Sequence, residues 1–380
     1  MIRAVLVDDE PPARVRMRQL LAAVGDVTVV GEAGSAIEAR EVIRETRPDL
    51  LFLDVEMPEM RGTALAATLP EPRPFIVFAT AFDHYGLEAI AVDATDYLLK
   101  PVSRAKLAAT LDRVRVRLAS QLVHRDIADA STVQAHMWPG SLPRIPGFDI
   151  AAASLPARGV GGDFYDLFPI GRGGSSDPPA RWALLLGDAS GKGVAAGLVA
   201  SAVQARVNTA ARLAHLDPEE LMAAVDRDVY ASTDGARYAT GIYAVLDAAA
   251  AKLTLVNAGH PAALVLAPGS SALAVRTLTA TGPALGLIEA GTFGSHSVTL
   301  KPGTMLVTYT DGVSEARNDS DDEFGDDRLV TLLNGCREQD AAAVCATILS
   351  AVRAFRGSRQ DQDDVTVMVV KAQGPEVSRS

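Results

Sequence analysis

Cysteine is nearly absent from the 380-residue sequence: only Cys336 and Cys345 occur, too far apart for a Cys-x-x-Cys motif. This argues against a disulfide framework or a cysteine-based metal site and favours two reduced thiols in a helical region. No apolar run approaches the roughly eighteen residues of a membrane span. Residues 1–7 lead directly into an acidic stretch and lack the longer apolar core of a signal peptide, so we expect a cytoplasmic protein.

The sequence also lacks an excess of positive charge. It contains 36 Lys and Arg residues against 47 Asp and Glu residues, a net charge of −11. A nucleic-acid-binding protein needs a basic face, so this balance argues against one. The hydrophobic content of 48% and the charged content of 22% are ordinary for a soluble globular protein. The length suits two domains of roughly 100–200 residues each.

Short apolar runs alternate with helical patterns over the first 120 residues. The runs are too short for helices and are typical of buried parallel strands. They occupy residues 4–7, 27–30, 50–53, 75–79 and 97–99, with helices expected at 14–24 and 36–46. This alternation predicts a doubly wound, five-stranded parallel α/β sheet with any site at the carboxyl ends of the strands.

Polar residues follow four of these runs. Asp8 and Asp9 follow the first run, Asp54 the third, Thr80 the fourth and Lys100 the fifth. Three carboxylates at one sheet edge repel one another by about a few kcal/mol, which a divalent cation and a lysine would relieve. An acidic, all-oxygen site suits Mg²⁺. Asp54 could then accept a phosphoryl group, whose oxygens Thr80 and Lys100 could bind.

These segments resemble the receiver domain of two-component response regulators, over residues 1–118. The matching motifs are Val-Asp-Asp-Glu at 7–10, Leu-Asp-Val-Glu-Met-Pro at 53–58, Ala-Thr-Ala at 79–81 and Leu-Lys-Pro at 99–101.

The resemblance implies a role for each matching residue. Asp54 would be the phosphoacceptor, with a histidine kinase as the phosphodonor. Asp9 would bind Mg²⁺ directly, Asp8 would support it, and the backbone carbonyl of Glu56 would be a further ligand. Tyr97 matches the aromatic residue that changes rotamer on phosphorylation; the alternative is an ordinary aromatic at the edge of the core.

A helical connector follows, and we assign it to residues 119–147. Ser103 is a candidate N-cap for the helix that leads into it. Apolar residues recur at helical spacing at Leu107, Leu111, Val114 and Leu118. They could form a coiled-coil seam that joins two copies into a homodimer, or they could belong to the last receiver helix before a passive linker. Two heptads are too few to decide, and Pro139 and Pro143 end the helix.

From residue 148 the pattern changes to apolar runs that alternate with polar positions or end in Gly and Pro turns. Such runs are typical of antiparallel sheets. They occur at 182–186, 238–246, 252–257, 262–266, 304–308 and 365–370, with helices expected at 194–213 and 218–230. We therefore expect an α+β domain over residues 148–372, with helices outside the sheets, and a disordered tail at 373–380.

The segment 186–193, Leu-Gly-Asp-Ala-Ser-Gly-Lys-Gly, joins a strand pattern to a helix pattern. A nucleotide-binding P-loop is a first interpretation, but the spacing of the glycines and the residue after Lys192 do not fit it. Asp188 in this segment is instead one of several acids at chain turns, with Asp163, Asp311 and Asp363. Acids from four distant segments suggest hard cations. Two such cations can activate water and clamp a phosphate, which suits hydrolysis of a phosphate monoester.

Residues 148–371 resemble the PP2C-like, metal-dependent protein phosphatase domain of the SpoIIE/RsbU type. The matching motifs include Val-Gly-Gly-Asp-Phe-Tyr-Asp at 160–166, Gly-Asp-Ala-Ser-Gly-Lys-Gly at 187–193, Asn-Ala-Gly-His-Pro at 257–261, Thr-Asp-Gly at 310–312 and Asp-Asp-Val-Thr at 363–366. The resemblance implies two stacked antiparallel sheets flanked by helices and a serine/threonine phosphatase. The resemblance also implies the usual substrate of this family, a phosphorylated anti-sigma-factor antagonist of the STAS type. Dephosphorylation of this antagonist frees a sigma factor, a mechanism called partner switching.

The same resemblance implies a site for two Mn²⁺ or Mg²⁺ ions. Asp188 would bridge both ions, and Asp163 and the Ala189 carbonyl would bind one of them. Asp311 would bind the other, together with Asp363, which we favour over its neighbour Asp364. Classical relatives often have glycine in place of Ala189, which matters only if that turn requires a positive φ.

Other functions compete with this one. Gly-Gly-Asp-Phe at 161–164 is similar to the diguanylate cyclase signature, but its second acid is missing. A non-catalytic scaffold and a DNA-binding regulator are further alternatives. We expect His260 to stabilise a turn rather than act as a general acid, and the acidic stretch 319–327 to be a solvated loop rather than a Ca²⁺ site, since it lacks EF-hand spacing.

Overall fold

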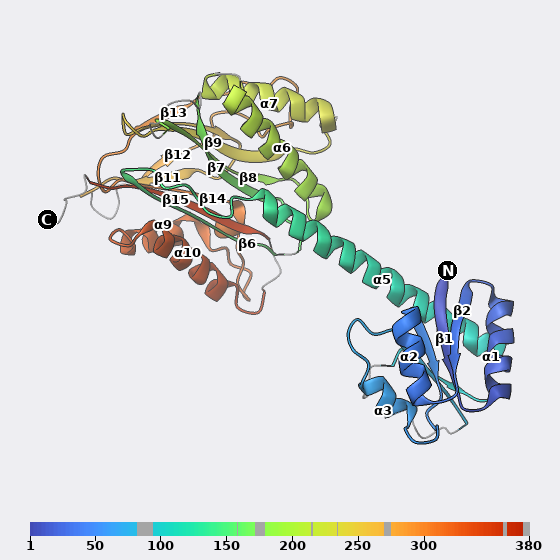
Figure 1. Cartoon of the computed structure of the whole chain (residues 1–380). Coiled ribbons are helices and arrows are strands. Elements are labelled where there is room, and N and C mark those ends of the chain that lie inside the picture. Colours follow the sequence, from blue (N-terminus) through green and yellow to red (C-terminus); the bar gives the residue numbers. More distant parts are fainter. Residues whose placement is uncertain are drawn as a thin grey trace. The chain divides into compact units, whose positions relative to one another are not determined.

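The structure is a computed structural model that describes residues 1–81, 94–157, 159–171, 179–213, 216–233, 235–269, 275–359 and 363–374. It divides into two compact units, Met1–Arg125 and Asp126–Ser380 (Figure 1). Within the described residues, no helix combines the length and apolar character needed to cross a membrane. Most of the tail expected at 373–380 lies outside the described residues.

The first unit contains a parallel sheet of five strands in the order β2-β1-β3-β4-β5. Its strands are β1 (Ile2–Val7), β2 (Val27–Ala33), β3 (Leu50–Leu53), β4 (Phe75–Thr80) and β5 (Asp96–Leu99). This confirms the predicted doubly wound sheet. The strand order reverses between β1 and β3, the switch point where such sheets bind ligands at their carboxyl ends.

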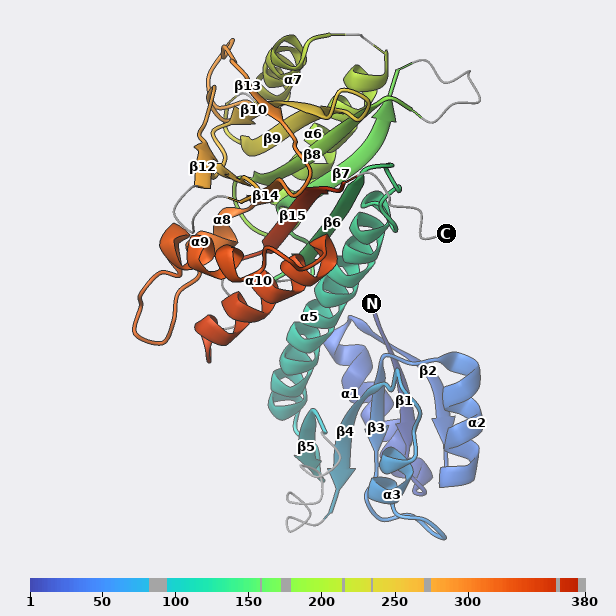
Figure 2. The ribbon, with the colours of Figure 1, turned by 90° about the vertical axis from the view of Figure 1, so that its left-hand side faces the viewer.

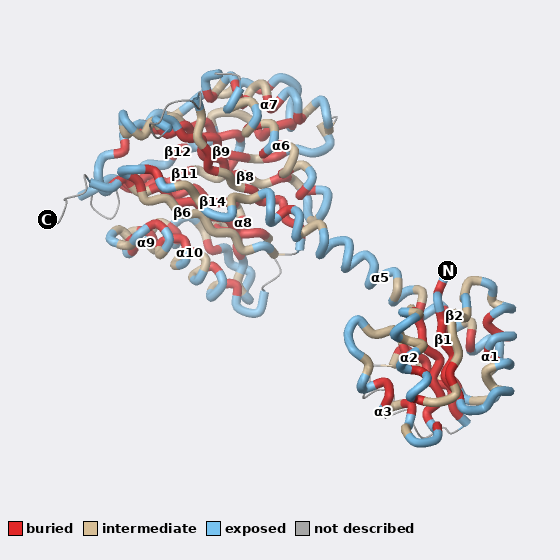
Figure 3. The backbone as a smooth tube through the Cα atoms, in the orientation of Figure 1, coloured by how far each residue is buried: buried red, intermediate tan, exposed pale blue. Residues whose placement is uncertain are grey.

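Helices cover both faces of this sheet because its strands are apolar on both sides (Figure 3). Helices α1 (Pro11–Val24) and α5 (Arg104–Met137) pack on the face that carries Leu6 and Phe52. Helices α2 (Ala36–Thr46) and α3 (Gly62–Ala67) pack on the face that carries Val7 and Leu53. The predicted cap of α5 is confirmed, since the Lys106 backbone N–H donates to the Ser103 hydroxyl at 3.2 Å.

The packing of helix α5 shows whether the apolar stripe that contains Leu107, Leu111 and Val114 belongs to the receiver core or forms a coiled-coil seam. Leu107, Leu111 and Val114 are fully buried against the receiver sheet. A coiled-coil seam through these side chains is therefore wrong, because their own sheet already covers them. The helix continues for 34 residues and ends before Pro139, as expected.

The second unit consists of two stacked, antiparallel sheets of five strands each (Figure 2). One has the order β13-β10-β9-β8-β7, and the other β12-β11-β14-β15-β6. The first sheet contains β7 (Asp163–Ile170), β8 (Arg181–Ala189), β9 (Ala239–Asp247), β10 (Lys252–Ala258) and β13 (His296–Thr299). The second contains β6 (Phe148–Leu155), β11 (Ala263–Leu266), β12 (Val275–Leu278), β14 (Met305–Tyr309) and β15 (Val365–Ala372).

Alternation along the strands builds three apolar layers. Leu184 and Leu186 face the interior between the sheets, whereas Ala183 and Leu185 face the outer helices. The first sheet is covered by α6 (Val194–Leu213) and α7 (Pro218–Thr233). The second is covered by α8 (Asp311–Ser314), α9 (Gly325–Gly335) and α10 (Ala341–Arg356). The predicted α+β sandwich with outer helices is confirmed.

Candidate active sites

The receiver acids lie together, as the sequence predicts. Ligand atoms of Asp8, Asp9 and Asp54 all lie within 4.8 Å of one another. Lys100 Nζ lies 2.6 Å from Oδ2 of Asp8 and 2.6 Å from Oδ2 of Asp54. A hollow of about 460 Å³ opens over Asp9, Asp54, Thr80 and Lys100, which leaves room for an incoming phosphoryl group.

Burial and charge set the protonation of this cluster. Burial raises the pKa of Asp54 above its ordinary value, and the hydrogen bond and charge of Lys100 only partly offset this. Burial alone would lower the pKa of Lys100, but its hydrogen bonds to Asp54 and Asp8 outweigh burial and raise it. The lysine therefore stays protonated and compensates part of the negative charge.

The remaining receiver candidates lie around this cluster. Thr80 Oγ1 is buried and has no hydrogen-bond partner among the residues that the structure describes, so it has donor capacity left for a phosphoryl oxygen. The Glu56 backbone N–H donates to Asp54 Oδ1 at 3.3 Å. Tyr97 is half-buried against the core on the α2 face. A Cβ at Gly62 would lie 1.9 Å from the Asp54 carbonyl oxygen, so only glycine lets α3 approach the chain after β3 this closely.

In the second unit, both sheets contribute acids to one corner. Asp163 on β7 is directly opposite Asp188 on β8 in the antiparallel register. Asp311 begins α8 directly after β14, and Asp363 precedes β15 in the same sheet. The Thr310 hydroxyl donates to Asp163 Oδ2 at 2.8 Å and so links the two sheets at this corner.

These acids are less compact than the receiver acids, and the pKa values of Asp163, Asp188 and Asp311 are raised above their ordinary value. No three of them, among the described residues, bring ligand atoms within 4.8 Å of one another. Burial, followed by the charges of Asp311 and Asp363, raises the pKa of Asp188 to about 8. Burial, Glu315 and Asp363 raise the pKa of Asp311 to about 6, and burial raises that of Asp163 well above its ordinary value. Such a set of mutually repelling oxygen ligands, of which Asp163 is buried and the others are partly exposed, fits divalent cations.

The neighbours Asp363 and Asp364 have different surroundings. Both carboxylate oxygens of Asp364 accept backbone N–H groups, from Ala157 at 2.8 Å and Gly162 at 2.9 Å. The side chain of Asp363 is half-exposed, lines the same hollow as Asp311, and lies 3.1 Å from Lys192 Nζ. Among the described residues, Asp363 Oδ1 accepts only the Asp364 backbone N–H, at 3.1 Å, and its half-exposed carboxylate in the hollow is better placed to serve a cation than that of Asp364. Lys192, for which the sequence indicated no role, contacts this ligand set through Asp363 Oδ2.

Glycines explain how the corner packs so closely. A Cβ at Gly162 would lie 2.7 Å from both the Ala189 carbonyl and Asp188 Oδ1, so any side chain there would collide with the site. Ala189 is buried and has no positive φ; Gly191 and Gly193 take that conformation instead, at φ 99° and 70°. Alanine therefore fits where classical relatives have glycine.

Gln134 is a residue that the sequence did not reveal. This side chain on α5 is buried; its Nε2 donates to the Gly161 carbonyl at 2.7 Å and its Oε1 accepts the Gly161 N–H at 3.0 Å. The amide thus holds the backbone two residues before Asp163. A polar residue at one position of a helix carries no sequence signal of such a contact.

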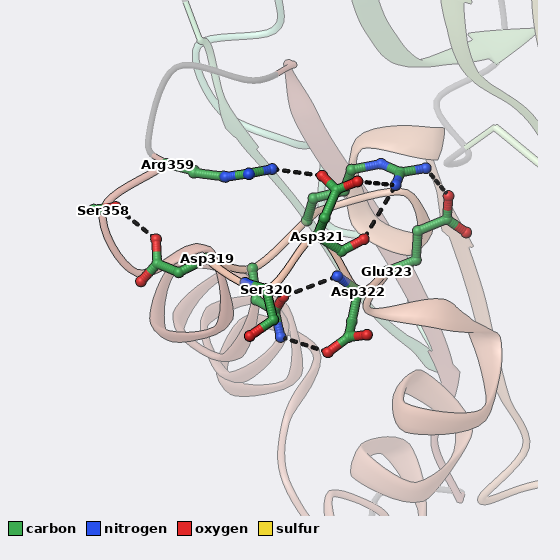
Figure 4. A network of polar contacts seen from close by, with 9 residues as sticks. Asp319, Ser320, Asp321, Asp322, Glu323, Ser358 and Arg359 are labelled. Carbon is green, nitrogen blue, oxygen red and sulfur yellow. Dashed lines mark hydrogen bonds and ion pairs between the residues drawn. The ribbon is translucent and has the colours of Figure 1, made fainter.

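The structure also bears on the expectations for His260 and for the acidic stretch 319–327. His260 is buried, its Nδ1 lies 2.8 Å from the Thr240 hydroxyl, and burial lowers its pKa to about 3. A neutral, buried imidazole fits a role in stabilising the turn better than a role as a general acid. In the acidic stretch, Asp321 is bound by arginines rather than left open to a cation, as Figure 4 shows.

The fold combines a receiver-like domain with a PP2C-like domain, and comparisons with known proteins agree. The family model "Stage II sporulation protein E (SpoIIE)" matches residues 178–373, and the response regulator receiver domain model matches residues 4–112. The chain belongs to the SpoIIE family and carries a receiver domain. A diguanylate cyclase is inconsistent with this family and fold.

Solved structures and curated relatives each match part of the chain. The SiaA-PP2C domain of Pseudomonas aeruginosa has a TM-score of 0.56 at 18% identity, covering 67% of this chain and 98% of its own, and shows the shared fold. The RsbU and RsbW domains of Rv1364c from Mycobacterium tuberculosis give 0.51 at 26%, covering 62% and 64%. The transcriptional regulatory protein BtsR of Salmonella typhi is 46% identical over 122 residues, 32% of this chain. The chain spans about half the length of the curated relatives it matches.

Proposed function

We propose that the chain is a response regulator in which phosphorylation of Asp54 controls a metal-dependent serine/threonine protein phosphatase. The observation that carries this proposal is the convergence of Asp163, Asp188, Asp311 and Asp363 at one corner of the PP2C-like sandwich. We assign the receiver to residues 1–118, the connector to 119–147 and the phosphatase to 148–372.

In the receiver, Asp8, Asp9, Asp54 and the Glu56 carbonyl would hold a Mg²⁺ ion, which supplies charge neutralisation when bound. A carboxylate oxygen of Asp54 attacks the phosphorus of the kinase's phosphohistidine. The P–O bond of the acyl phosphate forms as the P–N bond breaks, and the histidine imidazole leaves with the electron pair of that bond. Lys100, already beside Asp54, and Thr80, with its unpartnered hydroxyl, hold the phosphoryl oxygens. Tyr97 would respond by a change of rotamer.

In the phosphatase, Asp163, Asp188 and the Ala189 carbonyl would hold one Mn²⁺ or Mg²⁺ ion, and Asp188, Asp311 and Asp363 the other. Such a pair lowers the pKa of water and clamps a phosphate for in-line displacement. Asp188 would contribute to holding both ions, and its carboxylate would therefore link the two sets of acids. Thr310 orients Asp163, and Asp364 ties the backbone of Gly162 in place.

The substrate class follows from the family resemblance. We assign a phosphorylated STAS-type anti-sigma-factor antagonist as the substrate of this chain. Its dephosphorylation then frees a sigma factor in partner switching. The RsbU and RsbW domains of Rv1364c, similar at 26% identity, support this context. A non-catalytic scaffold is the alternative, and the complete acid set favours an enzyme.

Hydrolysis of p-nitrophenyl phosphate with Mn²⁺ tests the enzyme assignment. Asp188→Asn and Asp311→Asn should each lower the rate more than about 100-fold, since even outer-shell partners of metals contribute 10- to 100-fold. Full activity in either variant would contradict the two-metal assignment. Candidate phosphorylated antagonists, incubated with and without phosphorylation of Asp54, then identify the substrate.

We also assign a homodimer, formed by apolar side chains of α5 that remain exposed. They include Val116, Val123, Val133 and Met137. Val116 and Val123 are one heptad apart, and Met137 lies two heptads beyond Val123, as a coiled-coil seam requires.

A further inference from the structure

A hollow of about 530 Å³ adjoins the candidate metal acids of the phosphatase. Asp311 and Asp363 line it, together with basic side chains that the proposed reaction does not use. These basic residues are Lys192, Arg317, Arg356 and Arg359. Guanidinium groups bind carboxylates in a defined geometry, so this wall is suited to an anionic part of a substrate.

Arg356 is the innermost of these cations. It is 2% exposed, and its Nη2 donates to the backbone carbonyls of Gly312 at 3.1 Å and Asp363 at 3.0 Å. Its Nε is buried and has no hydrogen-bond partner among the described residues. Arg356 lines the hollow, so its guanidinium adds positive charge to the inner wall.

The outer two cations already hold a carboxylate of the chain itself (Figure 4). Asp321 Oδ1 lies 2.7 Å from Nη1 of Arg359, and its Oδ2 lies 3.3 Å from Nη1 of Arg317. The Asn318 side chain shapes the loop by accepting the Asp322 backbone N–H at 2.9 Å. The side chain of Asp321 is 62% exposed, and exposed ion pairs of this kind exchange readily because they contribute little.

We propose that Arg317, Arg356 and Arg359 form a subsite for an acidic side chain next to the phosphorylated residue of the substrate. Asp321 fills the outer part of this subsite in the free protein. A substrate carboxylate replaces Asp321 on the same guanidinium groups, whereas a neutral side chain cannot. The subsite therefore selects acidic phosphoprotein segments, and it rests on the proposed phosphatase function because it adjoins Asp311 and Asp363.

Two phosphoserine peptides that differ only in Asp or Asn beside the phosphoserine test this subsite. Fluorescence anisotropy measures their affinity for the full chain without metal, and KM is measured with Mn²⁺. The wild type should prefer the acidic peptide about fivefold, the strength of an exposed ion pair. Arg359→Gln should abolish the preference, and Asp321→Asn should increase it about two- to fivefold by removing the competitor.

Matched controls separate this effect from a general change of charge. Arg353→Gln removes an exposed arginine of α10, the helix that ends at Arg356, from a position outside the hollow. Asp322→Asn removes a carboxylate of the loop that contains Asp321. Both should keep the wild-type preference. Equal affinity of the wild type for the two peptides, or a preference that survives Arg359→Gln, overturns the subsite. A preference in anisotropy without hydrolysis of p-nitrophenyl phosphate supports the subsite and contradicts the phosphatase proposal.

Discussion

The receiver and the phosphatase both gather aspartates at strand ends, but they handle the negative charge differently. In the receiver, Lys100 lies 2.6 Å from two of the three carboxylates. In the phosphatase, the nearest such contact is Lys192 with Asp363, where both side chains are about half exposed. The pKa of Asp188 accordingly rises to about 8. The receiver carries its own partial counter-charge, whereas the phosphatase corner depends more strongly on ions from solution.

The largest expected effect is the loss of phosphate labelling at the receiver site. Asp54→Ala should eliminate labelling by a small phosphodonor such as acetyl phosphate, because it removes the nucleophilic carboxylate. Asp112→Ala, which removes an exposed carboxylate of the same unit, should label like the wild type. Label that persists in Asp54→Ala would refute the assignment of Asp54 as the phosphoacceptor. It would also refute the comparison of a phosphoacceptor site in the receiver with a separate metal site in the phosphatase.

The next effect tests whether the apolar stripe of α5 belongs to the receiver core. Leu111→Asp places a charge in a fully buried position and should lower the free energy of unfolding by about 3–5 kcal/mol. Val123→Asp, at an exposed position, should leave this free energy within about 0.5 kcal/mol but weaken dimer formation. Thermal unfolding and sedimentation measure the two quantities. A stable Leu111→Asp variant would contradict the packing described above.

The contrast in charge compensation predicts a difference in pH dependence. In the metal-free phosphatase, Asp188 and Asp311 bind protons more tightly in the folded than in the unfolded state, so stability should fall as pH rises from about 4 to 8. Mn²⁺ affinity should rise over pH 6–8, by about tenfold per pH unit for each proton released. Calorimetry in buffers of different ionisation enthalpy counts these protons. Affinity independent of pH would show that the acids are already ionised.

The smallest expected effect is a change in Mn²⁺ affinity when Gln134, which contacts the backbone beside the phosphatase acids, is replaced. Gln134→Ala leaves both backbone groups of Gly161 without their partner, and the apparent Mn²⁺ affinity should fall about tenfold, as for other outer-shell contacts. Gln121→Ala, on an exposed face of the same helix, is the control. Equal affinity in both variants would show that the amide does not position the metal acids.

The sequence predicted much of this arrangement because its strongest signals are local. The receiver strands end at acids, so the sheet order alone brings Asp8 and Asp54 together. The strand β6 is less visible, since its Ala-rich sequence, FDIAAASL, carries little alternation. Gln134 and Arg356 were missed because their importance comes from groups distant in the chain. The stripe through Leu111 was ambiguous because burial against a sheet and burial against a second helix select the same spacing.

The hydrogen bond between Thr310 and Asp163 has a thermodynamic consequence. It joins the two sheets where each contributes its acids, so a cation that binds both sets binds only the closed sandwich. Every such ligand stabilises the folded state by RT ln(1 + [L]/Kd). The supply of Mn²⁺ or Mg²⁺ in the cell would then govern how long each molecule survives proteolysis as well as how fast it turns over substrate.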